Sequence, residues 1–333
     1  MASQQILSRS FVRTSGSALV HMLVPAIVLL SINHGYAQSF PLKPVRLVTG
    51  GAASNSDFAA RVVGQGLTGI FKQQVIVENR PSGVILGEIV ARASPDGHTL
   101  LISGSSFWLA PFLQNKLPWD PVRDFVPVVL VSSAPNIIVV NPALSIKSVY
   151  DLIAYAKLRP GELNYASGST GSTPHLAAEL FKAMAGVDIT RINYKGSGQA
   201  VTDVIGGQMP LMFAAAGSVI NHIKAGRLRA LAVTSLRPSP LAPGLPAVAE
   251  AGVAGYECLS LTGLFAPAKT SAALIQRLNR DTNTVLAAAD IKERLLGSGV
   301  EAVGGSPEQF AAVVQGEIKR LGRLIRDTGI QND

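Results

Sequence analysis

The sequence predicts an α/β protein built as a hinged clamshell, with two lobes joined by two chain crossings. Short β-rich runs alternate with helical patterns along most of the chain, which is typical of βαβ units around a mainly parallel sheet. Two longer β-rich stretches, residues 125–142 and 256–268, interrupt this alternation and are candidates for the crossings. Helical segments after the second stretch are expected to return to the first lobe, which leaves a cleft between the lobes.

The 333-residue chain begins with a segment unlike the rest. Arg9 and Arg13 precede an apolar run over residues 18–32, and the small residues Gly-Tyr-Ala end at Ala37. This order is typical of a secretory signal peptide, whereas the run is short for a membrane anchor. We therefore expect an exported protein whose signal peptide, residues 1–37, is removed near Ala37.

Composition and charge exclude several classes of protein. With 47% hydrophobic and 15% charged residues, the chain is globular and long enough for two cores. The net charge of +8 comes from Lys and Arg residues that are spread singly, so a field that favours anionic solutes is expected rather than a nucleic-acid surface. The single cysteine, Cys258, excludes an intrachain disulfide and is expected to be a buried apolar filler.

Domain 1 is expected to be discontinuous, with residues 38–140 and 263–333. Its predicted strands lie, in order, at residues 45–49, 74–81 and 99–104. In its C-terminal part, Ser271 and Asp290 are predicted helix caps, and residues 306–309, Ser-Pro-Glu-Gln, are a predicted capping box with Pro at the first helical position.

Domain 2 is expected to span residues 141–262. Ser148 is a predicted helix cap, and that helix is expected to end at Pro160-Gly161. The strands predicted after it lie at residues 163–167, 188–194, 210–216 and 229–235, separated by helical segments. This alternation indicates a second α/β unit.

Two loops share a pattern of glycines and small hydroxyl residues between a strand and a helix. The first loop covers residues 50–56 and the second covers residues 167–173, with Thr173 as the predicted helix cap; a weaker third case lies at residues 102–108. The first turn of a helix offers unpaired amides at the positive end of the dipole, and glycine lets a ligand approach the backbone. One such loop from each lobe is able to grip two ends of a small dicarboxylate. Ordinary βα turns remain the alternative interpretation, because the same residues dominate all turns.

The order and spacing of many separate motifs then resemble one family. They include "RLVTGGAASNSDFAARVV", "VIVENRPSG", "ARASPDGHTLL", "LNYASGSTGSTPHLAAELFKAMAGVDI" and "INYKGSGQAVTDVIGGQMPLMF". The chain from about residue 40 to residue 330 resembles the Bug family, the extracytoplasmic solute-binding receptors of tripartite tricarboxylate transporters. The resemblance implies a type II periplasmic-binding-protein fold, a periplasmic location, a small carboxylate ligand held by the two loops and by water, and membrane permease subunits as partners. A monomer is expected.

Several positions depart from the family pattern, so the resemblance does not carry over the identity of the ligand. Thr49 stands where the family has Pro-Phe before its first glycines, and residues 53–57 read Ala-Ser-Asn-Ser-Asp in place of two glycines before Thr-Asp. The segment after Pro81 is shorter and lacks a glycine cluster. Ala214 replaces an acid, and Leu261-Thr262 replaces an aromatic pair.

The residues predicted to contact the ligand come mainly from the two loops. They are Gly50, Gly51, Ala52, Ala53, Ser54, Asn55, Ser56, Asp57, Ser105, Ser167, Gly168, Ser169, Thr170, Gly171, Ser172, His175 and Tyr194.

Five of these residues have an alternative interpretation. Asn55 and Ser56 either cap the helix after the first loop or touch the ligand. Asp57 either holds a ligand ammonium group or is a favourable charge in the first turn of a helix. His175 either donates to the ligand or is a packed or solvent-facing histidine. Tyr194 either reaches the cleft with its hydroxyl or buries its ring with the tip in water; its neighbour Lys195 is expected to be solvated.

No pattern in the sequence indicates catalysis, a metal site or a cofactor. The histidines of the mature chain, His98, His175 and His222, are far apart in sequence, and a Walker loop, a nucleophile elbow and a zincin motif are absent. A G-x-G-x-x-G match at residues 64–69 follows a helical segment instead of a strand, so it does not predict a dinucleotide site.

The first functional hypothesis is therefore a periplasmic receptor that captures a carboxylate between its lobes and delivers it to a permease. A ligand-sensing subunit for a signalling partner is the second hypothesis. A small hydrolase on the same fold is the third, and the lack of a nucleophile–base motif speaks against it.

Overall fold

The computed structural model describes residues 40–331, with the exception of residues 53, 81, 82, 115 and 195. The predicted signal peptide, Ala53 and Lys195 therefore lie outside the described residues. Within the described part of the chain, no helix is both long enough and apolar enough to cross a membrane.

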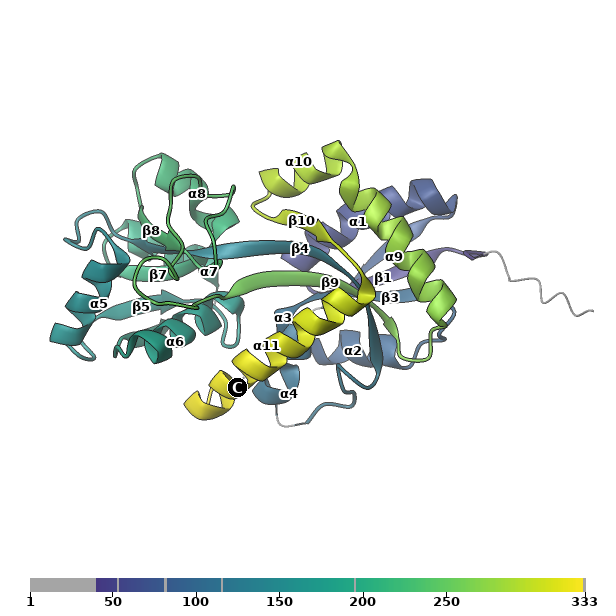
Figure 1. Cartoon of the computed structure of the whole chain (residues 1–333), viewed down its shortest axis with the longest axis horizontal. Coiled ribbons are helices and arrows are strands. Elements are labelled where there is room, and N and C mark those ends of the chain that lie inside the picture. The colour runs from purple at the N-terminus through teal and green to yellow at the C-terminus, as the bar shows by residue number, and fades with distance from the viewer. Residues whose placement is uncertain (1–39, 53, 81–82, 115, 195, 332–333) are drawn as a thin grey trace, which may run out of the picture. The chain divides into compact units, whose positions relative to one another are not determined.

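A sheet in the order β2-β1-β3-β9-β4-β7-β5-β6 runs through the described chain (Figure 1). At one end the strands β1, β2 and β3 are parallel, and β9 joins β3 in the antiparallel direction. The bounds of these strands are Val45–Thr49 for β1, Val75–Asn79 for β2, Thr99–Gly104 for β3 and Leu259–Pro267 for β9. At the other end β5 (Asn164–Ser167) is parallel to β6 (Thr190–Asn193) and to β7 (Leu211–Ala215).

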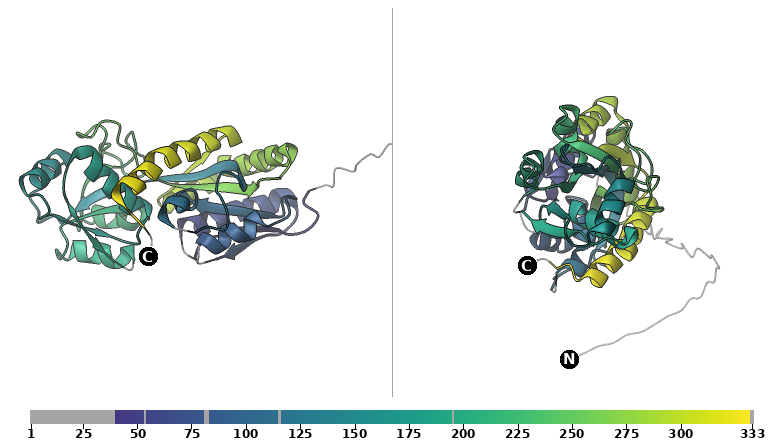
Figure 2. Two further views of the ribbon diagram at one scale, coloured as in Figure 1. Left: turned by 90° about the horizontal axis from the view of Figure 1, so that it is seen from below. Right: turned by 90° about the vertical axis from the view of Figure 1, so that its left-hand side faces the viewer.

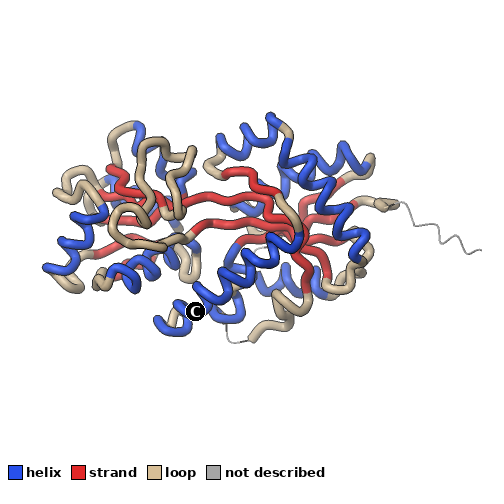
Figure 3. The backbone as a smooth tube through the Cα atoms, viewed as in Figure 1, coloured by secondary structure: helices blue, strands red, loops and turns tan. Residues whose placement is uncertain are grey.

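The long strand β4, Phe125–Val140, belongs to both ends of the sheet. Its residues 125–135 pair with β9, and part of the same stretch pairs with β10 (Glu301–Gly304). Its residues 136–140 pair instead with β7 and with β8 (Arg229–Val233). Figure 3 shows the resulting strands running from one lobe into the other, so the predicted clamshell of two α/β lobes joined by two crossings is confirmed.

A buried hydrogen-bond group ties the two crossings together where β4 changes partners. The backbone N–H of Asn136 donates to Thr234 Oγ1 (2.7 Å), and Thr234 Oγ1 donates to the carbonyl oxygen of Cys258 (2.6 Å). Asn136 Nδ2 also donates to that carbonyl (3.2 Å), and all three residues are fully buried. Cys258 is thus part of a packed interior, as predicted.

The helices of the first lobe come from both ends of the chain. They are α1 (Asn55–Phe71), α2 (Gly83–Ala91), α3 (Ser105–Trp108), α4 (Ala110–Leu113), α9 (Ala272–Ala287), α10 (Ala289–Gly297) and α11 (Pro307–Thr328). Ser271 caps α9 and the capping box at Ser306 opens α11, both as predicted. The prediction for Asp290 is wrong, because α10 begins earlier, with Ala288 as its N-cap, and Asp290 lies in the first turn.

The last helix, α11, anchors the C-terminal part of the chain to the crossings. Phe310 packs over Gly263 of β9 so closely that a Cβ at Gly263 would lie 1.9 Å from Phe310 Cζ. Trp108 and Phe265 complete this aromatic core. Farther along, α11 also contacts α6 of the second lobe (Figure 2).

The helices of the second lobe are α5 (Val149–Leu158), α6 (Thr173–Ala185), α7 (Ser197–Ile205) and α8 (Ala216–Lys224). Ser148 caps α5 through the backbone N–H of Asp151, as predicted. The predicted cap of α6 is wrong by one residue: Ser172 is the N-cap, and Thr173 already has helical geometry. Ser172 has extended backbone geometry, and its N–H donates to the carbonyl oxygen of Ser169 (3.1 Å).

Candidate ligand-binding site

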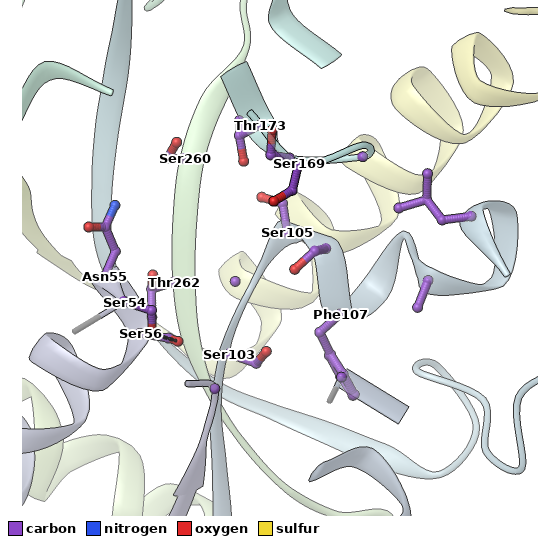
Figure 4. Close-up of a pocket in the computed structure, with 18 of the residues that line it drawn as sticks. Ser54, Asn55, Ser56, Ser103, Ser105, Phe107, Ser169, Thr173, Ser260 and Thr262 are labelled. Atoms are coloured by element: carbon purple, nitrogen blue, oxygen red, sulfur yellow. Dashed lines mark hydrogen bonds between the residues drawn. The ribbon is translucent and has the colours of Figure 1, made fainter. Parts of the chain in front are cut away.

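A cavity of about 560 Å³ receives residues from both predicted loops (Figure 4). The loop residues that line it are Gly50, Gly51, Ser54, Asn55, Ser56, Ser169, Thr170, Gly171, Ser172 and Thr173. A volume of this size is typical of a small-molecule site. Two segments more than a hundred residues apart are therefore brought together as the sequence pattern predicted.

The first loop leads from β1 into α1 and is closed by its own side chains. Ser54 Oγ accepts the backbone N–H of Asp57 (3.2 Å) and lies 3.0 Å from Ser56 Oγ. Asn79 Nδ2 donates to the carbonyl oxygen of Gly50 (2.8 Å), which turns that carbonyl toward the neighbouring strand end. Figure 4 shows Ser54, Asn55 and Ser56 grouped on one side of the cavity.

Asp57 lies behind this loop and is not among the residues that line the cavity. Its side chain is 6% exposed, accepts a hydrogen bond from Asn79 Nδ2 (2.8 Å) and pairs with Arg61 (3.0 Å). The geometry favours the interpretation of Asp57 as a charge in the first turn of α1 that organises the loop from behind.

The second loop leads from β5 into α6 and is braced from outside the loop. The guanidinium of Arg191 donates to the carbonyl oxygen of Gly168 (2.9 Å) and to Thr170 Oγ1 (3.2 Å). Gly171 has φ +70°, a left-handed conformation that favours glycine. Ser172 makes no side-chain capping bond, so its hydroxyl is not used to close the helix.

His175 supports the second loop instead of lining the cavity. Its ring is buried, and Nδ1 accepts the backbone N–H of Gly171 (3.0 Å). Burial, with a further contribution from the nearby positive charge of Arg191, lowers the pKa of His175 to about 4. The imidazole is therefore neutral near pH 7, with an Nδ1 lone pair available for the loop.

Four other predicted residues also lie off the cavity wall. The hydroxyl of Tyr194 donates to Asp203 (2.8 Å) on α7. Burial, and to a smaller extent this hydrogen bond, raises the pKa of Tyr194. Ser167 and Gly168 lie where β5 ends, beneath the lining part of the loop, and Ala52 is exposed. The remaining prediction, Ala53, lies outside the described residues.

Strand ends and a short helix contribute polar residues that sequence reasoning mostly missed. Ser103 and Gly104 end β3, Ser105 and Ser106 begin α3, and Ser260 and Thr262 of β9 project from one face of that crossing strand. Residues 103–106 lie in the weaker third loop, from which only Ser105 was predicted to contact the ligand, and Thr262 was noted only as a departure from the family pattern. For Ser260 and Thr262 the available signal was their alternation along a β-rich run, because residues two apart share a face.

Apolar side chains form the remaining wall. Leu86, Phe107, Ala110, Leu113 and Trp119 line it, with Gly83 and Gln114 nearby. Phe107 stacks on Trp119 with ring centroids 4.7 Å apart. Ala214, where an acid was expected from the resemblance, is buried in β7, while Ala215 next to it lines the cavity.

The described lining contains no charged side chain. In the same part of the chain, no group of His, Cys, Asp and Glu residues is arranged to hold a metal ion. Chemically, this cavity is able to bind through backbone amides, hydroxyls and apolar contact.

Comparisons with known proteins place this geometry in a family. Residues 59–330 match the model of the tripartite tricarboxylate transporter family receptor, TctC. The UPF0065 protein in the tcbD-tcbE intergenic region of Pseudomonas sp. (strain P51) is 37% identical over 294 residues, 86% of this chain and 87% of its own length. BugT of Bordetella pertussis is 36% identical over 298 residues, 88% of this chain and 91% of its own.

Solved structures agree with this assignment. R. palustris Rpa4515 with adipate has a TM-score of 0.75 at 34% identity and covers 87% of this chain and 99% of its own. MatC from Rhodopseudomonas palustris with bound malate has a TM-score of 0.72 at 27% identity and covers 86% of this chain and 100% of its own. The implied type II periplasmic-binding-protein fold is confirmed. On the family model and on these relatives, the chain belongs to the receptors of the tripartite tricarboxylate transporter family, which are periplasmic solute-binding proteins.

Proposed function

We propose that this protein captures a small organic acid between its two lobes and delivers it unchanged to membrane permease subunits. The observation that carries the proposal is the pair of glycine and hydroxyl loops, one from each lobe, on the wall of one cavity. The relatives with bound adipate and malate support a carboxylate as the ligand class. Binding proteins, and not enzymes, make up these relatives, which agrees with the lack of a catalytic constellation in the described lining.

The site binds an anion without a fixed counter-charge. Hydrogen bonds to a charged group contribute about 1.5–3 kcal/mol each. Several such bonds from loop amides and hydroxyls, after the costs of association, correspond to the roughly 8 kcal/mol of a micromolar complex. The candidate donors are the lining residues of the two loops together with Ser103, Ser105 and Thr262.

Lobe closure accompanies binding in this proposal. Donors from both loops are satisfied together only in the closed state, so the ligand selects that state. We place the bending point at Asn136, Thr234 and Cys258, where β4 changes partners and the crossings are tied. The domain limits near residues 140 and 262 stay a prediction close to this point.

The cellular arrangement follows from the same proposal. The signal peptide is removed near Ala37, the mature protein acts as a monomer in the periplasm, and the liganded form docks on the permease. Mass spectrometry of the exported protein gives its first residue, and light scattering gives its oligomeric state. A retained leader or a stable dimer would contradict these two points.

Calorimetry tests the central proposal. Adipate, malate and succinate are titrated into the purified mature protein, with adipamide as the uncharged control for adipate. We expect at least one acid to bind and to raise the melting temperature, because a ligand that prefers the folded state stabilises it. No binding across the acids, equal binding of adipamide, or chemical conversion of the acid would overturn the proposal.

A further inference from the structure

The cavity has two chemically different ends. Around the two loops its wall consists of hydroxyls and backbone, whereas Leu86, Phe107, Ala110, Leu113 and Trp119 present carbon at the other end. Figure 4 shows Phe107 across the cavity from the group formed by Ser54, Asn55 and Ser56. A ligand that fills the cavity therefore meets polar partners along one part of its length and an apolar surface along the other.

The aromatic side chains of the apolar end pack against one another, and their polar atom, Trp119 Nε1, already has a hydrogen-bond partner. Trp119 Nε1 donates to the carbonyl oxygen of Val84 (2.9 Å), so the indole offers only its ring to the cavity. Phe125 packs edge-on against both Phe107 and Trp119, with centroids 4.8 and 5.8 Å away. A hydroxyl or a carboxylate placed against these rings would lose its water without gaining a partner, which is costly.

The border between the two ends carries an unused hydroxyl. Ser105 lines the cavity and is 3% exposed, and its Oγ has no hydrogen-bond partner within the described structure. A ligand oxygen at this border would satisfy Ser105. Figure 4 shows Ser169 of the second loop entering the cavity in the same region, so both lobes offer hydroxyls there.

We infer that the ligand is an organic acid with an unsubstituted apolar body, several methylenes or an aromatic ring, and not a compact hydroxy acid or tricarboxylic acid. This inference rests on the proposed function and specifies its ligand class. The carboxylate, or each carboxylate of a dicarboxylate, lies at the loops and Ser105, and the hydrocarbon part lies against Phe107, Leu113 and Trp119.

Acids matched in pairs test the inference on the wild-type protein. Succinate and adipate differ by two methylenes, and malate is succinate with one hydroxyl added; butanoate and hexanoate repeat the length comparison with a single carboxylate. We expect about fourfold tighter binding for each methylene that reaches the apolar end, hence about fifteenfold for adipate over succinate. Malate is expected to bind more weakly than succinate.

A pair of variants tests the apolar end directly: one fills it with a larger side chain, and the other makes the same substitution on the surface. Ala110→Leu places a larger side chain at the lining position of α4, and Ala273→Leu makes the same change at an exposed position of α9. We expect Ala110→Leu to abolish the adipate advantage while succinate binds within about twofold, and Ala273→Leu to behave as wild type. Circular dichroism checks that Ala110→Leu folds; if it does not, the wild-type series decides alone.

The outcomes separate the two proposals. Tightest binding of malate, or equal binding across each length series, overturns the apolar-body inference and leaves the receptor proposal standing. An adipate advantage that survives in folded Ala110→Leu also overturns the inference. Failure of every acid to bind overturns the receptor proposal itself.

Discussion

The first loop, residues 50–56, and the second loop, residues 167–173, both join a strand to a helix across a run of glycines and hydroxyls, yet they use their donors differently. In the first loop, Ser54 Oγ caps α1 by accepting the backbone N–H of Asp57, and the buried Asp57 places a negative charge at that helix end. In the second loop, Ser172 makes no capping bond, α6 has no acid in its first turn, and Arg191 braces the loop from behind. An anion is therefore expected to be held more strongly by the second loop, where the positive helix end is uncompensated. The lesson is that one local pattern yields two electrostatic environments, and tertiary partners decide which.

The largest expected effect concerns His175, which supports the second loop only. Its pKa is about 4 in the folded protein against an ordinary value of 6.5. Between these values the unfolded chain binds a proton that the folded chain does not, so stability is lost as the pH falls from 6.5 to about 4. The full loss is about 3 kcal/mol, from 1.36 kcal/mol for each pKa unit.

Urea unfolding at pH 7 and pH 4 of the wild type and His175→Gln measures this loss. The variant removes the titration of residue 175, while Glu179 and Lys182 beside the ring are present in both proteins. The unfolding free energy of the wild type minus that of His175→Gln should be about 3 kcal/mol smaller at pH 4 than at pH 7. An advantage that does not change with pH would show that His175 is not held neutral.

A pair of glycine substitutions compares the loops directly. Gly171→Ala forces a side chain into φ +70°, which costs about 1–2 kcal/mol, and it disturbs the N–H bond to His175. A Cβ added at Gly51 has no atom of the described residues within 4 Å. We expect calorimetry to give at least tenfold weaker carboxylate binding for Gly171→Ala and less than threefold for Gly51→Ala; equal losses would remove the asymmetry between the loops.

A pair of serine substitutions separates stability from binding. Ser54→Ala removes a helix cap and is expected to cost about 1 kcal/mol of unfolding free energy. Ser172→Ala removes no capping bond, so its unfolding free energy should stay within about 0.5 kcal/mol while carboxylate affinity falls about tenfold. Chemical denaturation and calorimetry on both variants check this. The opposite assignment of effects would reverse the roles given to the two hydroxyls.

The smallest expected effect concerns the arginines behind the loops. Arg61 pairs with Asp57 from a side chain that is 55% exposed, so Arg61→Gln should cost only about 0.2–1 kcal/mol of stability and little affinity. Arg191→Gln removes the bonds to Gly168 and Thr170 and should weaken carboxylate binding more than Arg61→Gln does. Thermal melts and titrations of the two variants compare them, and a larger affinity loss for Arg61→Gln would contradict the bracing role of Arg191.

Local chemistry made much of the fold predictable. The capping box was predicted from Ser306 and Gln309, three positions apart, and the caps at Ser148 and Ser271 from their places before helical segments. The structure confirms all three. The two crossings were visible as β-rich stretches longer than the other strands. Asp290 and Thr173 were misplaced as caps, because several residues near a helix start have suitable side chains and only the backbone geometry selects one.

The candidate site was predictable in one part only. Its glycine and hydroxyl loops carry a local signature, and nine of their predicted residues line one cavity together with Ser105. Leu86, Phe107, Leu113 and Trp119 carry no such signature, since apolar residues fill cores and cavities alike. His175 and Tyr194 were assigned to the ligand because their partners, Gly171 and Asp203, were not known from spacing.

The sequence by itself determined the alternation of strands and helices, the family, and the two loops rich in amide and hydroxyl donors, because these depend on residues close together along the chain. Only the tertiary structure decided that Asp57 and His175 lie off the cavity wall, that Ser105 Oγ has no hydrogen-bond partner among the described residues, and that apolar side chains form the other end. Those properties depend on contacts between segments far apart in sequence, where packing and buried hydrogen bonds, not local propensity, select each side chain's partner.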